Sequence, residues 1–183
     1  MKLKKGWACI FLFVVVACSS VPIKDGDLDK LSPEKLNQMA VDLWKNGKYT
    51  DPETALKYVN TAIEINPEYG RAYYTRGFIY GDLKKYQSAI DSFTEALGLD
   101  PNIQETYNGR GWAYSVLDQH KKAIEDYTKA IEIDPKYKLA YNNRAMSYLK
   151  LNQNEKACID FQKVCELGDC QNIKHARKIG KCQ

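Results

Sequence analysis

The sequence predicts an all-α protein built as a solenoid of stacked helical hairpins. The first observation is an internal repeat, because the dipeptides Asn66-Pro67, Asp100-Pro101 and Asp134-Pro135 recur every 34 residues. The second is the spacing of apolar residues at i, i+3 or i+4 and i+7 in each half of a unit, which gives two amphipathic helices. A single hairpin cannot bury both of its faces, so successive hairpins are expected to stack into one continuous core.

Aromatic and small residues keep fixed positions within the repeated unit. The first half repeats Tyr73, Tyr107 and Tyr141, then Gly77, Gly111 and Ala145, then Tyr80, Tyr114 and Tyr148. The second half repeats Ala89, Ala123 and Ala157, then Phe93, Tyr127 and Phe161, then Ala96, Ala130 and Val164. The small residues let paired helices approach closely, and the aromatics fill the space between hairpins. Proline ends each unit because it disfavours helix at the preceding residue.

These repeats resemble the tetratricopeptide repeat (TPR) family over roughly 140 residues. The resemblance implies a right-handed superhelical TPR solenoid of four helix-turn-helix repeats. Their expected ranges are 33–69, 70–103, 104–137 and 138–169, with a C-terminal capping helix within 170–183.

The first repeat departs from the pattern. Its first helix is expected to begin at Ser32-Pro33, as N-cap and first residue. That helix would carry Leu36, Met39, Ala40, Leu43 and Trp44. The segment 50–52 is interpreted as a three-residue insertion after the turn, with Asp51 starting the second helix.

The N-terminal segment predicts export. Lys2, Lys4 and Lys5 precede an apolar run over 7–16, which is shorter than the roughly 20 residues that span a bilayer. Residues 15–18, Val-Val-Ala-Cys, resemble the lipobox of bacterial lipoproteins. This resemblance implies a signal peptide over 1–17 and a palmitate-type lipid on Cys18. An ordinary signal peptide is the alternative, because Val15 and Ala17 also satisfy the small-x-small rule.

Ser19 after the lipidated cysteine implies, by the same resemblance, sorting to the outer membrane. We therefore expect a protein of the bacterial cell envelope that is lipid-anchored and faces the periplasm. Residues 18–31 are polar, contain Pro22 and Gly26, and are expected to form a flexible tether.

Four cysteines lie near the C-terminus: Cys158, Cys165, Cys170 and Cys182. An even number in an exported protein points to disulfides. Cys158 and Cys165 are about 10 Å apart along one helix, too far to pair with each other. If the last two helices turn at Gly168-Asp169, the favoured pairs are Cys165–Cys170 and Cys158–Cys182. The pairs Cys158–Cys170 and Cys165–Cys182, and a four-cysteine zinc site, are the alternatives.

The charge balance argues against a nucleic-acid surface. The 183 residues include 27 basic and 23 acidic ones, a formal charge of +4. Three of the basic residues are in the signal segment, and residues 173–183 hold four more without an acid. The basic excess therefore belongs to an export signal and one terminal helix, which is a candidate for contact with anionic lipid.

Motifs for catalysis, phosphate binding or metal ligation are not found in the sequence, and no cofactor is expected. His120 and His175 are both interpreted as surface residues. Arg76, Arg110 and Arg144 recur every 34 residues. They could clamp an anionic ligand or pair with acids such as Asp126 and Asp160, and the second interpretation is favoured.

The TPR resemblance implies a concave groove lined by the first helix of each repeat. The expected peptide-binding residues are Val41, Trp44, Tyr74, Phe78, Asn108, Trp112, Asn142 and Met146. Exposed aromatic rings beside amide groups suit capture of a peptide. The alternative is that Phe78 and Trp112 pack between hairpins. The Lys and Asn pattern with which some TPRs bind a ligand's carboxy-terminus is not reproduced.

These observations predict a non-enzymatic adaptor or assembly scaffold that binds a protein partner. The alternatives are an accessory or regulatory subunit of a cell-wall enzyme and a self-associating structural protein. Trp112→Ala would test self-association, because it would weaken a dimer that packs through the groove.

Overall fold

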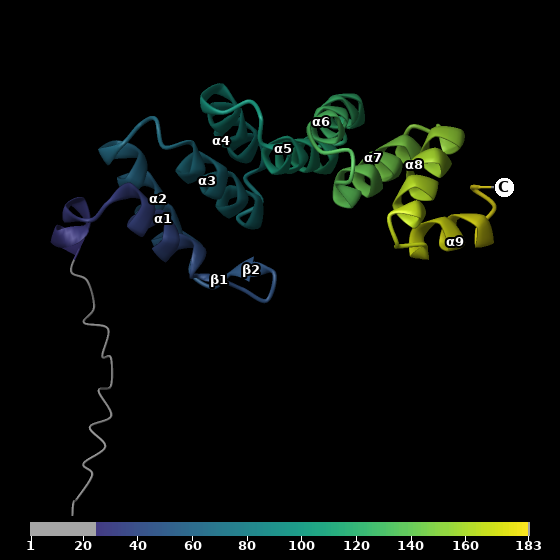
Figure 1. Cartoon of the computed structure of the whole chain (residues 1–183). Helices are drawn as coiled ribbons and strands as arrows, with labels where there is room; N and C mark the ends of the chain where they lie inside the picture. Colours follow the sequence, from purple (N-terminus) through teal and green to yellow (C-terminus); the bar gives the residue numbers. More distant parts are fainter. Residues whose placement is uncertain (1–24, 183) are drawn as a thin grey trace, which may run out of the picture.

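The computed structural model describes residues 25–182, which form a single row of helical hairpins (Figure 1). The helices pair as α1 (Pro33–Val41) with α2 (Pro52–Ile65), α3 (Gly70–Asp82) with α4 (Tyr86–Leu99), α5 (Gln104–Val116) with α6 (His120–Ile133), and α7 (Lys138–Lys150) with α8 (Asn154–Glu166). Helix α9 (Gln171–Lys178) closes the array. Neighbouring helices pack together throughout, and α1, α3, α5 and α7 also contact one another in sequence order. The odd-numbered helices therefore form one layer, and the predicted all-α solenoid is confirmed.

The Asn/Asp-Pro dipeptides end the second helix of three repeats, as predicted. Asn66, Asp100 and Asp134 each accept a hydrogen bond from the backbone N–H two residues later, at 3.0, 2.9 and 2.9 Å. This side-chain turn, together with the proline, redirects the chain into the next hairpin.

Phe93 shows how the small residues set the spacing between helices. A Cβ atom at Gly77 would lie 2.6 Å from the Phe93 ring, and one at Gly109 would lie 2.8 Å from it. The fully buried ring thus spans its own hairpin and the next one. Tyr127 packs in a similar way within its own hairpin, where a Cβ at Gly111 would lie 2.8 Å from its ring. Glycine allows this packing because it presents no side chain.

The first repeat differs from its prediction. Helix α1 ends at Val41, and Trp44 lies instead in a short hairpin of β1 (Trp44–Lys45) and β2 (Lys48–Tyr49). The turn residues Asn46 and Gly47 both have left-handed backbone, with φ of 53° and 81°. Asn-Gly is the strongest turn signal for a two-residue hairpin, so the local turn preference ends the helix. The placement of Trp44 in the first helix was therefore wrong.

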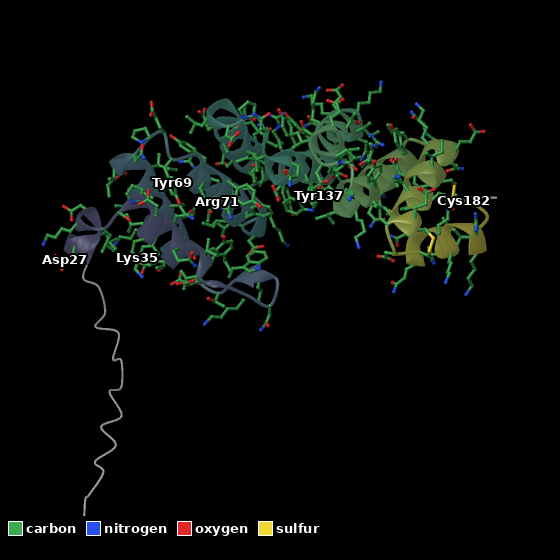
Figure 2. The ribbon with its side chains drawn as sticks, in the orientation of Figure 1. Asp27, Lys35, Tyr69, Arg71, Tyr137 and Cys182 are labelled. Atoms are coloured by element: carbon green, nitrogen blue, oxygen red, sulfur yellow. A yellow bond between two sulfur atoms is a disulfide. The ribbon has the colours of Figure 1, made fainter. Side chains whose placement is uncertain are left out.

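The N-terminal side of the array is covered by a 3-10 helix, η1 (Asp25–Lys30). Leu28 is buried in a cluster with Leu36, Ala62 and Ala72. The prediction of a flexible tether over 18–31 is therefore wrong for its last part, because Leu28 closes the apolar end of the first hairpin. Figure 2 labels Asp27 in η1 at one end and Cys182 at the other.

The predicted signal peptide and Cys18 lie outside the described residues. Within 25–182, no helix combines the length and the apolar character needed to cross a membrane.

Candidate protein-binding groove

Two adjoining pockets lie on the layer of odd-numbered helices. The first, of about 260 Å³, is lined by Val41, Trp44, Tyr49, Arg71, Tyr74, Thr75 and Phe78. The second, of about 340 Å³, is lined by Trp44, Gly47, Phe78, Asp82, Asn108, Gly109, Trp112, Leu139 and Asn143. Trp44 and Phe78 belong to both, so the two pockets form one continuous hollow, which we call the groove.

The aromatic rings in the groove hold one another in place. Phe78 meets Tyr74 at 4.9 Å and Phe93 at 5.2 Å between ring centroids, both edge to face. This geometry is favourable for aromatic pairs and anchors Phe78 to the buried core. The groove wall is therefore continuous with the packing that defines the fold.

Trp112 is packed on one side and open on the other. A Cβ atom at Gly81 would lie 2.7 Å from its ring, so the indole rests on bare backbone of α3. Its ring also meets Tyr86 edge to face at 5.8 Å. The residue is still 37% exposed. Both sequence interpretations of Trp112 thus hold in part, since it packs between hairpins and presents a face to the groove.

The β hairpin positions Trp44 over the groove. The Trp44 and Tyr49 rings meet edge to face at 5.0 Å, and the backbone N–H of Tyr49 donates to the Asp82 carboxylate on α3. Burial raises the pKa of the Tyr49 phenol, and the nearby Asp82 charge raises it further. Trp44 remains 41% exposed. The hairpin therefore forms a wall that the other repeats do not have.

Charged groups lie at the edges of the groove. The Arg71 guanidinium sits 5.1 Å from the Tyr74 ring centroid. Burial raises the pKa of Tyr74, and the Arg71 charge acts in the opposite direction. Glu105 on α5 also raises that pKa. A cation thus lies beside the first pocket, whereas Asp82 lines the second.

Six of the eight predicted groove residues line these pockets, and two do not. Asn108 is only 7% exposed and accepts a hydrogen bond from Asn143 Nδ2 at 2.9 Å. Asn142 accepts one from Asn172 Nδ2 at 2.8 Å and lines neither pocket. Met146 is exposed but also lies outside both. The amide oxygens of both asparagines thus already accept hydrogen bonds within the chain.

The sequence interpretation missed several lining residues, chiefly Tyr49, Arg71, Thr75, Asp82, Leu139 and Asn143. Arg71 and Thr75 lie one helical turn from predicted positions, so helical spacing could have found them. Leu139 and Asn143 come from α7, and only the superhelical stacking brings them to the hollow.

The arginine ladder ties neighbouring repeats together. Arg110 and Arg144 make paired hydrogen bonds to Asp126 and Asp160, at 2.8–2.9 Å. Each also donates to the preceding repeat, at Thr94 (3.1 Å) and Thr128 (3.0 Å). Both arginines are therefore structural, as the favoured interpretation predicted.

Arg76 occupies the same position with different partners. Ser92 replaces the aspartate, and the guanidinium donates to Ser92 Oγ at 3.2 Å and to Asn60 Oδ1 at 3.4 Å. Its side chain also lies over the Tyr73 ring, at 4.9 Å from the centroid. Arg76 thus links α2, α3 and α4, the equivalent helices one repeat earlier, through neutral groups, so it too is structural.

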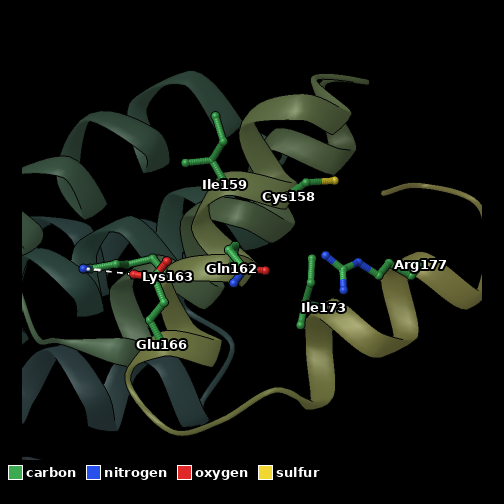
Figure 3. Close-up of a pocket in the computed structure, with 7 residues that line it drawn as sticks. All are labelled: Cys158, Ile159, Gln162, Lys163, Glu166, Ile173 and Arg177. Carbon is green, nitrogen blue, oxygen red and sulfur yellow. Dashed lines mark hydrogen bonds and ion pairs between the residues drawn. The ribbon is translucent and has the colours of Figure 1, made fainter. Parts of the chain in front are cut away.

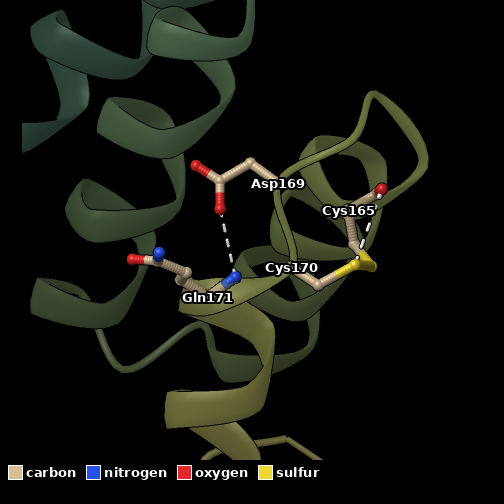
Figure 4. The surroundings of a disulfide bond; sticks show 4 residues. All are labelled: Cys165, Asp169, Cys170 and Gln171. Carbon is tan, nitrogen blue, oxygen red and sulfur yellow. Dashed lines mark hydrogen bonds between the residues drawn. A yellow bond between two sulfur atoms is a disulfide. The ribbon is translucent and has the colours of Figure 1, made fainter.

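The four C-terminal cysteines form two disulfides, Cys158–Cys182 and Cys165–Cys170. These are the pairs that the sequence favoured, and they use the thiols that a zinc site would need. Figure 4 shows Cys165–Cys170 closing the turn into α9, where Asp169 accepts a hydrogen bond from the Gln171 backbone at 3.1 Å. The bridges therefore hold α9 against α8.

His120 does not lie at the surface as predicted. It is 8% exposed, with Nδ1 3.5 Å from Ser115 Oγ and Nε2 3.5 Å from Asp118 Oδ1. His120 is the first residue of α6, and Ser115 and Asp118, at the end of α5 and in the turn after it, lie against its ring. His175 is exposed, as predicted. In the described part of the chain, no three His, Cys, Asp or Glu residues gather in a way that could hold a metal ion.

Comparison with known proteins identifies the repeats. A family model of the tetratricopeptide repeat matches residues 70–103 and 105–137, and a second tetratricopeptide repeat model matches 126–159. The chain therefore contains tetratricopeptide repeats, and its fold is a TPR solenoid. The sequence has no match among curated proteins.

Solved TPR structures share the architecture. A crystal structure of MamA protein is 25% identical, with a TM-score of 0.68, covering 78% of this chain and 75% of that one. MamA from Desulfovibrio magneticus RS-1 is 26% identical, with a TM-score of 0.68, covering 76% and 77%. The first TPR of Spaghetti (RPAP3), bound to an HSP90 peptide, is 27% identical, with a TM-score of 0.58, covering 61% and 90%.

Proposed function

We propose that this protein is a non-enzymatic adaptor or assembly scaffold that binds a partner's peptide or helix in the groove. The observation that carries this proposal is the continuous apolar hollow around Trp44, Phe78 and Trp112. Exposed aromatic side chains in a preformed hollow are the usual centre of a protein-binding surface. Because the core already holds the rings in place, binding a partner would cost little conformational entropy at this site.

The comparisons are consistent with this role, since one similar TPR structure is bound to a peptide. The arginines of the ladder make their hydrogen bonds within the array, whereas Trp44 and Trp112 in the groove keep part of their apolar surface exposed. The partner would place apolar side chains in the two pockets, on either side of Trp44 and Phe78, which line both.

We further propose that the protein acts in the bacterial cell envelope, lipid-anchored through Cys18 and facing the periplasm. The signal-like segment over 1–17 supports this placement. The two disulfides support it independently, because such bonds persist in oxidising compartments. If Cys18→Ser left processing and membrane attachment unchanged, the anchor would be refuted.

Affinity capture from envelope extracts tests the binding role. The variant Trp44→Ala/Phe78→Ala/Trp112→Ala should lose the partners that the unaltered chain retains. The matched control is Ile65→Ala/Leu99→Ala/Leu117→Ala, which removes three exposed apolar side chains outside the groove. Partners that survive the groove variant, or that both variants lose equally, would refute groove binding.

The same variants separate adaptor function from self-association. The mass of the isolated chain in solution should be that of a monomer. A stable dimer that Trp112→Ala dissociates would show instead that a second copy fills the groove.

A further inference from the structure

The C-terminal end of the array presents a stripe of cations. Lys174, Arg177 and Lys178 lie at i, i+3 and i+4 and share one flank of α9, and Lys181 follows directly. All four are exposed, and no acidic residue follows Asp169 in the sequence. This end therefore differs in charge from the body of the chain, where acidic and basic residues are interspersed.

The three lysines of the stripe are not needed to hold α9 in place. Ile173 and Ala176 bury the opposite side of the helix, and the Cys158–Cys182 bridge ties the chain after it to α8. Asn172 fixes the far flank by its hydrogen bond to Asn142 on α7. One or two cations in the last turn would satisfy the helix dipole. Lys174, Lys178 and Lys181 together therefore carry more positive charge than the end of this helix requires.

An apolar hollow adjoins the stripe. A groove of about 370 Å³ between α8 and α9 is lined by Ile159, Ile173 and Arg177, among others (Figure 3). Ile159 is 68% exposed, more than any other large apolar side chain in the described residues. In Figure 3 the Arg177 side chain extends toward Ile173 at the edge of this hollow. Cations and exposed apolar surface thus occur together.

We propose that this end of the array binds an anionic lipid surface, with the cations on lipid phosphates and Ile159 at the acyl boundary. A cluster of about four Lys and Arg residues attracts anionic bilayers, each contributing independently near the surface. The exposed isoleucine favours a lipid surface over an acidic protein, because a purely electrostatic partner gains nothing from it. This contact does not depend on a lipid at Cys18 or on a partner in the groove.

Vesicle binding tests the proposal directly. The chain from Ser19 to Gln183 retains every helix, core cluster and disulfide described above, and its melting curve checks that it folds. It should bind vesicles of phosphatidylcholine with about 30% phosphatidylglycerol, and not vesicles of phosphatidylcholine alone. Raising the salt concentration from about 50 to about 300 mM should release it.

Matched variants locate the contact. Lys174→Gln/Lys178→Gln/Lys181→Gln should weaken binding at low salt by at least about tenfold. Lys121→Gln/Lys136→Gln/Lys138→Gln removes the same charge from exposed positions elsewhere and should leave binding nearly unchanged. Ile159→Ser should weaken binding about threefold without any change in charge.

Three outcomes would overturn the proposal: no preference for phosphatidylglycerol, equal losses in the two lysine variants, or no effect of Ile159→Ser. Binding of poly-glutamate that depends on the α9 lysines, without binding of vesicles, would indicate an acidic protein partner instead.

Discussion

Gly77 has no side chain, and this allows the Phe93 ring of α4 to pack directly against the backbone of α3. Gly77→Ala should destabilise the protein by about 2 kcal/mol, because the new Cβ would lie 2.6 Å from a fully buried ring. Gly98→Ala is the matched control, since it lies in α4 with nothing within 4 Å of its Cβ position. It should stabilise by about 0.5 kcal/mol through higher helix propensity. Denaturant unfolding of both variants checks the pair, and equal effects would contradict this packing.

Arg76 offers a second test at the residue scale. Ser92→Asp should stabilise the array by about 1 kcal/mol, because it would recreate the paired hydrogen bonds that Arg110 and Arg144 make. The converse variant, Asp126→Ser, should cost about 3 kcal/mol by leaving the half-buried Arg110 without its carboxylate. Urea unfolding measures both. A destabilising Ser92→Asp would show that this site in the second repeat cannot accept the pairing.

The period of 34 residues was enough to predict the Arg110–Asp126 and Arg144–Asp160 pairs, because both partners recur in register. It could not reveal that Asn60, Thr94 and Thr128 complete each arginine's contacts. Those residues come from the preceding repeat, so their role depends on how hairpins stack and not on any local pattern.

Among the elements, α9 depends most on covalent bonds. Removing the Cys158–Cys182 bridge with Cys158→Ala/Cys182→Ala should destabilise the packing of α9 more than removing the other bridge with Cys165→Ala/Cys170→Ala. The reason is that the first bridge spans 24 residues and the second only 5. Chain entropy puts the difference at about 1 kcal/mol. Hydrogen exchange of the amides of residues 171–178 reports it, while the amides of α5 and α6 serve as the internal control. Equal protection of α9 in both variants would contradict this account.

The β hairpin and η1 show where repeat-based prediction stops at this scale. Asn46-Gly47 carries a strong local turn signal, but aligning the first repeat with the others placed Trp44 in a helix. η1 has no counterpart in the repeat, and Leu28 alone marks it as part of the core. The remaining helices follow the prediction because periodicity, proline and small residues all indicate the same boundaries.

For the whole molecule, the many buried phenols predict sensitivity to alkali. Burial raises the pKa of Tyr137 to about 12, and it also raises those of Tyr49 and Tyr127. The folded state therefore favours the neutral phenols, so their contribution is complete below the unfolded pKa of about 10. The free energy of unfolding should fall as pH rises from about 10 toward 12. Urea unfolding of Tyr137→Phe should show a smaller fall than the unaltered chain, and an equal or larger fall would contradict this assignment.

The six pocket-lining residues predicted from sequence came from the register of the first helices. The side of the second pocket that α7 forms could not be predicted in that way. It requires Leu139 and Asn143 of α7 to approach the hairpin of the first repeat, which only the curvature of the whole array achieves.

Photo-crosslinking in living cells tests the central claim, that the groove binds a protein partner. A photoreactive phenylalanine would replace Trp44 or Trp112 in the groove, and Ile65 or Leu99 at exposed ends of the second helices. We expect the same partner protein to crosslink to both groove positions and to neither control position, as identified by mass spectrometry. Equal crosslinking from all four positions, or crosslinks from the groove only to a second copy of this chain, would contradict the adaptor function.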